Sequence, residues 1–220
     1  MKVDLHIHSI YSGDSKLEVE DIAARCKALG IKGFAIVDHN SIEGSIRAMN
    51  MRKNDIIVLP GIEITCSTGH VIGYGITELI PRDMSVEETI EYIHDSGGIA
   101  VAPHPYRWWS GIGAKEILKN KFDAIETINA RSSFRSNDKA ANLRAIIGCA
   151  ETGGSDAHSL RQIGAASTIF SDNCEDADDL ILEILEKSTR AEGSSRKPLG
   201  TIGYGVKCIS EWVTRGMRRL

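Results

Sequence analysis

The sequence has no hydrophobic run long enough to cross a membrane. The longest runs, such as Ile56 to Leu59, stop far short of the roughly 18 apolar residues that a spanning helix needs. The first residues, MKVDLHIHS, place Asp4 and His6 where a signal peptide would need an apolar stretch. We therefore expect a cytoplasmic protein with no membrane partner.

Paired cysteines and an excess of positive charge are also missing. The five cysteines are scattered without a CxxC pair, which argues against a disulfide framework and against a thiolate zinc site. Lysine and arginine number 26 against 30 acidic residues, a net charge of −4, so we expect no charge-driven binding of duplex nucleic acid. Hydrophobic residues at 42% and charged residues at 25% are typical of a globular protein and exclude global disorder.

Strand and helix patterns alternate along the chain. The expected strands cover residues 2–8, 33–38, 56–65, 70–75, 99–103, 123–129 and 166–170, with a short one ending at Gly153. The expected helices cover residues 18–29, 42–52, 137–147 and 176–186, and another begins with a capping box at Ser85. This alternation predicts an α/β fold with a parallel sheet, open or closed into a barrel. No Gly-rich phosphate loop follows the first strand, which argues against an open Rossmann sheet.

Ionisable and imidazole side chains fall at or just after the carboxyl ends of the expected strands. They are His6, His8, Asp38, His39, Glu63, His104, Glu126, Asp156 and His158. In a (β/α) barrel these ends converge on one face, where active sites are built, whereas in an open sheet they are strung along a line. The pattern therefore favours a TIM-like barrel with a site at the carboxyl ends of its strands.

The spacing of these residues is typical of metal ligands. His6 and His8 lie two residues apart on a strand, so both imidazoles occupy one face, about 6.6 Å apart along the backbone. Asp156 and His158 repeat this spacing with a carboxylate and an imidazole. His39, Glu63, His70 and His104 add nitrogen and oxygen donors, and Asp14 follows the first strand. Such a donor set without thiolate suits Zn, Mn or Fe(II), and ligand type does not choose among them.

A structural role is the alternative for each histidine taken singly, because a histidine at a strand end often only forms hydrogen bonds. Six of the seven histidines follow the pattern together with three carboxylates. Burying so many ionisable groups is costly unless metal ions compensate for it. His94 matches no pattern, and we expect it on the surface.

The ordered motifs DLHIHS, VDHN, GIEIT, GH, APHP and GSDAH resemble those of the PHP (polymerase and histidinol phosphatase) superfamily of metal-dependent phosphoesterases. The resemblance runs from Lys2 to about Lys187. It implies a distorted (β/α)7 barrel over residues 1–190 with two to three divalent metal ions. Position by position, it implies a site of His6, His8, Glu63 and Asp156, a second of Asp14, His39 and His158, and a third of Glu63, His70 and His104. Family members usually carry Ser-Asp-Gly where this chain has Ser12-Gly13-Asp14, so the carboxylate lies one residue later.

The resemblance also implies the chemistry. Three divalent ions against the carboxylates of Asp14, Glu63 and Asp156 leave a charge of about +3, which attracts a phosphate ester and lowers the pKa of a bridging water towards about 7. The resulting hydroxide would attack phosphorus in line. We expect the substrate to be a small phosphomonoester or a nucleotide. Alternatives are a histidinol-phosphate phosphatase, a 5′-to-3′ exonuclease on short oligonucleotides, or a scaffold subunit that has lost catalysis.

Further residues are candidates for catalysis and substrate binding. Asp38 either orients a neighbouring imidazole or caps the next helix. Arg107, Arg131 and Arg135 lie on expected loops of the site face, where they either grip a phosphate or carboxylate or remain solvated. Arg131 is favoured, because family members often have Asn-x-Arg there. Trp108 and Trp109 either stack on a base or pack their loop.

The segment 191–220 has a different composition. A Gly- and Ser-containing stretch from Gly193 to Gly200 predicts a linker. Apolar residues at helical spacing from Val206 to Met217 predict an amphipathic helix that packs on the barrel or on a second subunit, with membrane-surface binding as the alternative.

Overall fold

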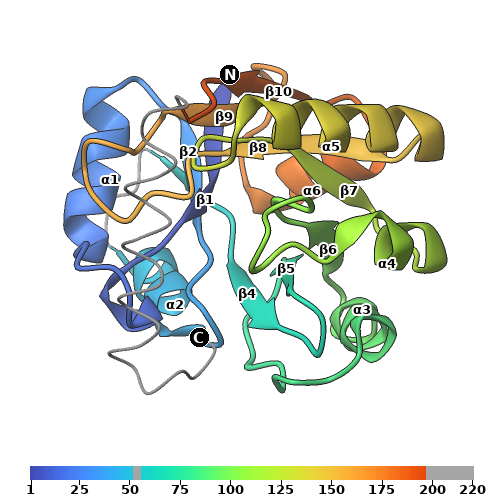
Figure 1. Cartoon of the computed structure of the whole chain (residues 1–220). Coiled ribbons are helices and arrows are strands. Elements are labelled where there is room, and N and C mark those ends of the chain that lie inside the picture. The colour runs from blue at the N-terminus through green and yellow to red at the C-terminus, as the bar shows by residue number, and fades with distance from the viewer. Residues whose placement is uncertain (52–55, 197–220) are drawn as a thin grey trace.

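The computed structural model describes residues 1–51 and 56–196, and these form two five-stranded sheets and six α-helices (Figure 1). The first sheet has the order β10-β9-β1-β2-β3, with β1 (Lys2–Ile7), β2 (Gly33–Ile36), β3 (Ile57–Val58), β9 (Ala166–Ile169) and β10 (Arg190–Gly193). The second has the order β4-β5-β6-β7-β8, with β4 (Gly61–Thr65), β5 (His70–Tyr74), β6 (Ile99–Ala102), β7 (Ala124–Asn129) and β8 (Ala150–Gly154). The helices are α1 (Val19–Ala28), α2 (Glu43–Met49), α3 (Val86–Asp95), α4 (Gly113–Lys119), α5 (Phe134–Ile147) and α6 (Ala177–Leu185), with a 3₁₀ turn η1 (Ile10–Ser12).

The expected α/β class is confirmed, but the sheets do not close into a TIM-like barrel, and the strands are not all parallel. β1, β2 and β3 are parallel, as are β6, β7 and β8. β5 is antiparallel to both of its neighbours, and β9 is antiparallel to β1 and β10. The structure is therefore a pair of mixed sheets rather than a closed (β/α)7 barrel.

Two local features explain this difference. Pro60 interrupts the expected strand 56–65, so that β3 lies in one sheet and β4 in the other. Proline has no backbone N–H to donate to a sheet. Only four residues join β4 to β5, with Gly69 at φ 75° in the connection. A crossover between parallel strands needs a dozen or more residues, so this short connection forces an antiparallel pair.

The two sheets are bridged at two places near the carboxyl ends of β1 and β2. Ile7 pairs with Ala157, and His39 pairs with Glu63, each as an isolated parallel bridge. Around the first bridge, the N–H of His8 donates to the carbonyl of Ala157 at 3.0 Å. His39 and Glu63 are themselves predicted ligands, and Ile7 and Ala157 each lie between two predicted ligands in the chain. The fold thus joins its two halves where the histidines and carboxylates lie.

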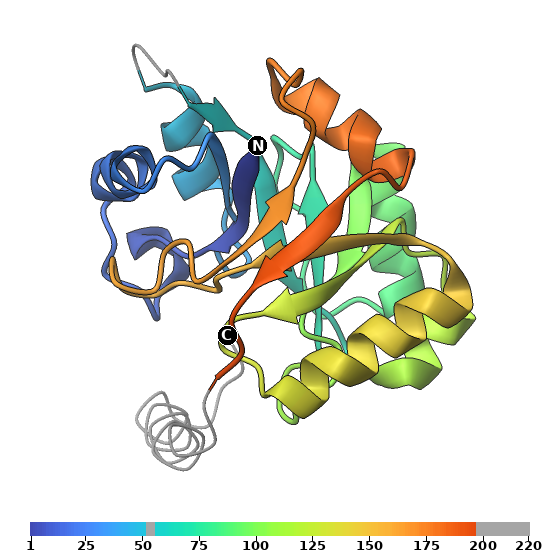
Figure 2. The same ribbon diagram turned by 90° about the horizontal axis from the view of Figure 1, so that it is seen from above.

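The helices cover the outer faces of the sheets. α1 and α2 lie on one side, while α3, α4 and α5 lie on the other (Figures 1 and 2). A central apolar cluster, which includes Leu5, Val37, Ile72 and Val101, takes side chains from both sheets and packs against α6 through Leu180. The capping box of Ser85 with Glu88 is present, as predicted. The core is therefore shared by both sheets and holds them together beneath the bridged end.

Several boundaries differ from the expectations. α5 begins at Phe134 rather than at residue 137, because Ser133 accepts a hydrogen bond from the N–H of Ser136 and caps it. α4 and β10 had no expected counterpart. β10 continues past residue 190, where the sequence predicted that the domain ends and the linker begins. The expected C-terminal helix lies outside the described residues. Within residues 1–51 and 56–196, no helix is both long enough and apolar enough to cross a membrane.

Candidate metal centre

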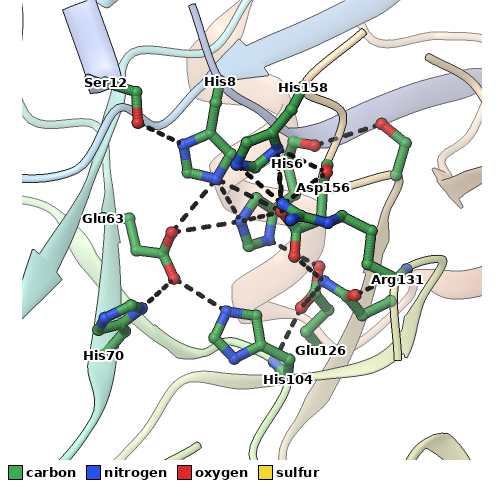
Figure 3. A network of polar contacts seen from close by, with 12 residues as sticks. His6, His8, Ser12, Glu63, His70, His104, Glu126, Arg131, Asp156 and His158 are labelled. Atoms are coloured by element: carbon green, nitrogen blue, oxygen red, sulfur yellow. Dashed lines mark hydrogen bonds and ion pairs between the residues drawn. The ribbon is translucent and has the colours of Figure 1, made fainter. Parts of the chain in front are cut away.

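All nine predicted metal ligands lie in one cluster at the bridged ends of the two sheets. Figure 3 shows Glu63 and Asp156 with the hydrogen bonds and ion pairs that join them to the histidines around them, which are His6, His8, His70, His104 and His158. The donor atoms form five triads, and within each triad the three atoms lie within 4.8 Å of one another. The triads are His6–His104–Asp156, His6–His8–Glu63, His8–Asp156–His158, His8–Asp14–His39 and His39–Glu63–His70. The triads share members, so the cluster is one continuous set of nitrogen and oxygen donors.

β1 supplies the first pair of imidazoles. The alternation of a strand predicts that His6 and His8 face the same way, and their Nε2 atoms lie 3.2 Å apart. Both side chains are buried. β8 approaches β1 closely because it carries glycine at position 154, where a Cβ atom would lie 2.3 Å from the Cβ of His6. Gly154 therefore makes room for His6 at this end of the strand.

Glu63 is the centre of the cluster. Its Oε1 accepts hydrogen bonds from Nδ1 of His70 at 2.9 Å and from Nε2 of His104 at 3.0 Å. Its Oε2 lies 3.3 Å from ring nitrogens of both His8 and His39. Burial raises the pKa of Glu63, but the surrounding imidazoles outweigh burial and hold the pKa well below its usual value. Glu63 is therefore an ionised carboxylate placed between five histidines from four segments of the chain, His6 included.

Asp14 joins the cluster from the loop that follows η1. Its Oδ2 accepts from Nε2 of His158 at 2.7 Å and lies 3.9 Å from Nε2 of His39. Its Oδ1 accepts from the hydroxyl of Ser12 at 2.8 Å. Burial raises the pKa of Asp14, yet the hydrogen bond from His158 and the nearby imidazoles lower it far more. The shifted Ser-Gly-Asp order thus still brings the carboxylate to the histidines.

Asp156 lies at the other edge of the cluster, with its backbone in the left-handed region at φ 53°. Its carboxylate accepts hydrogen bonds from Arg107, from Nη1 of Arg131 at 2.9 Å and from the side chain of Asn129 at 3.1 Å. His104 is also left-handed, at φ 29°. Strained backbone of this kind is typical of functional sites, where the surrounding structure holds residues in uncommon conformations.

The cluster fits divalent metal ions. Nδ1 of His39 and Oε2 of Glu63 are buried, and neither forms a hydrogen bond. Leaving such atoms unpaired is costly, and a bound cation would satisfy both. Burial lowers the pKa of His39 and of His104, the latter to about 4, which keeps these imidazoles neutral as metal ligands must be. The role of the nine residues as ligands stays a prediction.

Three residues that the sequence did not identify as ligands contact the predicted ligands. Glu126 on β7 accepts from Nδ1 of His6 at 2.9 Å and from the N–H of His104 at 2.8 Å. Asn129 binds Arg107, Glu126 and Asp156 at once. Ser12 lies 3.1 Å from Nδ1 of His8 and accepts from the N–H of His39. The alternation along β7 pointed to Glu126, but nothing in the sequence joined it to His6.

The remaining candidates are Asp38 and three arginines. Asp38 gives α2 no side-chain cap, because its carboxylate accepts from the N–H and the hydroxyl of Ser9, both at 2.6 Å, and its role in orienting an imidazole stays a prediction. Asp38 therefore fixes the turn directly after His8. Arg107 and Arg131 lie beside the cluster, because each forms an ion pair with the carboxylate of Asp156. Arg135 is exposed in the first turn of α5, and its role in substrate binding stays a prediction.

Curated relatives with similar sequences come from two organisms. The chain is 39% identical over 141 residues to the uncharacterized protein MJ1587 of Methanocaldococcus jannaschii, covering 59% of this chain and 82% of that one. It is 32% identical over 190 residues to the uncharacterized protein MJ0417 of the same organism, covering 82% and 75%. A short match of 44% over 41 residues, 19% of this chain and 18% of the other, relates it to a probable histidinol-phosphatase of Thermotoga maritima.

Solved structures share the fold at low sequence identity. A two-domain protein of Bacteroides vulgatus, described as containing a predicted PHP-like metal-dependent phosphoesterase, matches with a TM-score of 0.74 at 15% identity, over 88% of this chain and 65% of that chain. Endonuclease Q in complex with a 27-mer duplex substrate matches with a TM-score of 0.69 at 15% identity, over 88% and 60%. The expectation that excluded duplex nucleic acid is therefore wrong, because net charge alone does not prevent a chain of this fold from binding a duplex.

The family is shown by a model that covers most of the chain. The PHP domain model matches residues 4–191, which contain all ten strands and six helices of the described residues except the ends of β1 and β10. This agrees with the order of the motifs and with the cluster that they form. The chain belongs to the PHP domain family.

Proposed function

We propose that the chain is a metal-dependent phosphohydrolase that acts on phosphomonoesters, with two to three divalent ions held by the nine clustered residues. The observation that carries this proposal is the set of five overlapping donor triads around the buried, ionised Glu63. Nitrogen and carboxylate donors suit Zn, Mn or Fe(II), and the ligand types leave the choice among them open.

Bound divalent ions would supply Lewis acidity and a water of lowered pKa, which is the chemistry that phosphoester hydrolysis needs at neutral pH. The chain supplies the arrangement. Asp156 and Glu63 carry the negative charge that holds cations, and burial keeps bulk water away from them. Arg107 and Arg131 bring two guanidinium groups to the edge of the cluster, where they would bind phosphate oxygens of a substrate.

The division of ligands among the ions is part of the proposal. His6, His8, Glu63 and Asp156 form one site, and Asp14, His39 and His158 form the second. Glu63, His70 and His104 form the third. Of the five observed triads, His6–His8–Glu63 lies within one such set, and each of the other four takes two members from one set and one from another. Glu63, as a member of two of these sets, would help to hold two of the ions.

A panel of phosphate esters, diesters included, distinguishes the candidate substrates. The short match to a probable histidinol-phosphatase makes histidinol phosphate one member. The shared fold of Endonuclease Q makes a duplex with an abasic lesion another, and a short 5′-phosphorylated oligonucleotide is a third. A scaffold without catalysis is the alternative of another class, and it predicts turnover of none of them.

Hydrolysis of p-nitrophenyl phosphate tests the proposal. We expect turnover that disappears on chelation and returns with Mn²⁺, Zn²⁺ or Fe²⁺. His8→Ala and Asp156→Asn should each abolish turnover and leave the fold intact by circular dichroism. His94→Ala is the matched control, because His94 is an exposed histidine bound to Asp123 outside the cluster, and it should keep wild-type turnover. Wild-type turnover in either cluster variant contradicts the proposal.

A further inference from the structure

Exposed aromatic side chains gather on the segments that follow β6 and β7. Among the described aromatic residues, the three with the largest exposed fractions are Trp108 at 88%, Phe134 at 71% and Trp109 at 48%. We call these three residues the aromatic rim. Other aromatic residues, such as Phe34 and Tyr74, are buried in the core. Exposing large aromatic surfaces gives up the stabilisation of burial, so their presence on one edge of the site needs a reason.

The rim adjoins the metal centre through two arginines. Arg107, directly before Trp108, donates to the carboxylate of Asp156 and to the side chain of Asn129, the latter at 2.7 Å. Arg131, three residues before Phe134, donates to the same carboxylate at 2.9 Å. Both parts of the rim therefore lie on segments whose arginines contact Asp156.

The loop that carries the tryptophans is firmly held. The N–H of Gly111 donates to the carbonyl of Arg107 at 2.8 Å, and the N–H of His70 donates to the carbonyl of Ser110 at 3.1 Å. A Cβ atom at Gly111 would lie 2.4 Å from the carbonyl oxygen of Pro105, so the loop closes tightly around this glycine. Its two indoles meet edge to face with centroids 6.4 Å apart. The loop therefore presents Trp108 on a fixed base beside the predicted ligand His70.

We propose that Trp108, flanked by Trp109 and Phe134, stacks on the nucleobase of a nucleotide whose phosphate binds at the metal centre. The proposal rests on the proposed function and names the substrate class of the same site. An aromatic face exposed beside two guanidinium groups matches a ligand that is a planar ring at one end and an anion at the other. Every base offers such a face, so stacking selects for nucleotides without selecting one base. The alternative that Trp108 packs its own loop is inconsistent with its exposure.

Two phosphomonoesters that differ only in the base test the proposal. Adenosine 5′-monophosphate and ribose 5-phosphate share the sugar and the phosphate, and only the first can stack. We expect the wild-type protein to prefer the nucleotide in kcat/KM, and Trp108→Ala to reduce this preference by about fivefold to a hundredfold. Trp108→Phe, which keeps an aromatic face, should retain most of it. Tyr92→Ala is the matched control, because Tyr92 is an exposed aromatic on α3, outside the rim.

A binding measurement separates this proposal from the proposed function. The phosphonate analogue of the nucleotide cannot be hydrolysed, and its binding to metal-loaded protein can be measured by isothermal titration calorimetry, which does not depend on the tryptophan that the variant removes. Binding that Trp108→Ala weakens supports the stacking surface, even if no phosphoester is turned over. Equal kcat/KM for the two esters, together with analogue binding that Trp108→Ala leaves unchanged, overturns the stacking surface and leaves the phosphohydrolase intact.

Discussion

Oε1 of Glu126 lies 2.9 Å from Nδ1 of His6, and both side chains are almost completely buried. The carboxylate accepts a hydrogen bond from Nδ1–H, which leaves Nε2 directed at Glu63 and Asp156. The other oxygen of Glu126 holds the backbone of His104. One carboxylate therefore orients two of the predicted ligands without being one of them.

Removing Glu126 should weaken metal binding. We expect Glu126→Ala to lower the affinity for the metal by about tenfold to a hundredfold, since partners that orient metal-bound histidines have effects of this size. Glu126→Gln, which can still accept a hydrogen bond from His6, should lose less. Competition with a chromogenic chelator measures the affinity. Glu116→Ala, on the surface of α4, is the control, and an affinity for Glu126→Ala equal to that of the wild type contradicts the assigned role.

Metal binding at pH 7 should release protons. Burial lowers the pKa of His6, but Glu126, Asp156 and Glu63 outweigh burial and raise the pKa well above its usual value. The metal-free imidazole is therefore protonated at pH 7 and must lose a proton to bind a cation. The pKa values of Asp14, Glu63 and Asp156 are lowered, so these groups are already ionised and release none. It follows that affinity should fall as the pH falls.

Calorimetric titration in two buffers with different ionisation enthalpies measures this release. The apparent binding enthalpy should differ between the buffers in proportion to the protons released. Equal enthalpies in both buffers would show that His6 is neutral before the metal binds.

Arg131 and Arg135 should differ in their importance for turnover. Arg131 donates to Asp156 at the edge of the cluster, whereas Arg135 is exposed on the first turn of α5. We expect Arg131→Ala to reduce kcat/KM by about tenfold to a hundredfold, the effect of losing a hydrogen bond to a charged group. Arg135→Ala should stay within about twofold. If steady-state kinetics show a larger loss of kcat/KM in Arg135→Ala than in Arg131→Ala, the residue that binds phosphate is Arg135 on α5.

A methyl group at position 154 should disturb the metal centre. In Gly154→Ala the new Cβ would lie 2.3 Å from the Cβ of His6, so β1 and β8 must separate. We expect a loss of stability of about 1–3 kcal/mol in urea unfolding together with a lower metal content. Gly97→Ala is the control, because its Cβ meets nothing within 4 Å although the backbone is left-handed at φ 80°. Gly97→Ala should lose stability and keep its metal. An unchanged metal content in Gly154→Ala would contradict the close contact between β8 and His6.

The sequence predicted the ligand cluster better than the arrangement of the strands. The spacing of His6 and His8 depends only on strand alternation, and the family resemblance divided the candidate ligands into three sites, which spacing alone could not do. The strand order was harder to predict from the sequence, because the antiparallel placement of β5 depends on a short connection and on Pro60. Glu126 was placed at the site but without a role, because its partner, His6, lies 120 residues away and no local pattern reports a contact of that range.

The metal content of the protein purified without chelator tests the central claim most directly. Elemental mass spectrometry should find two to three divalent ions per chain in the wild type and in His94→Ala. Glu63→Ala should hold fewer, because Glu63 contacts five of the histidines. A wild-type protein that holds no metal, and takes up none when supplied with Zn²⁺, Mn²⁺ or Fe²⁺, would contradict the account.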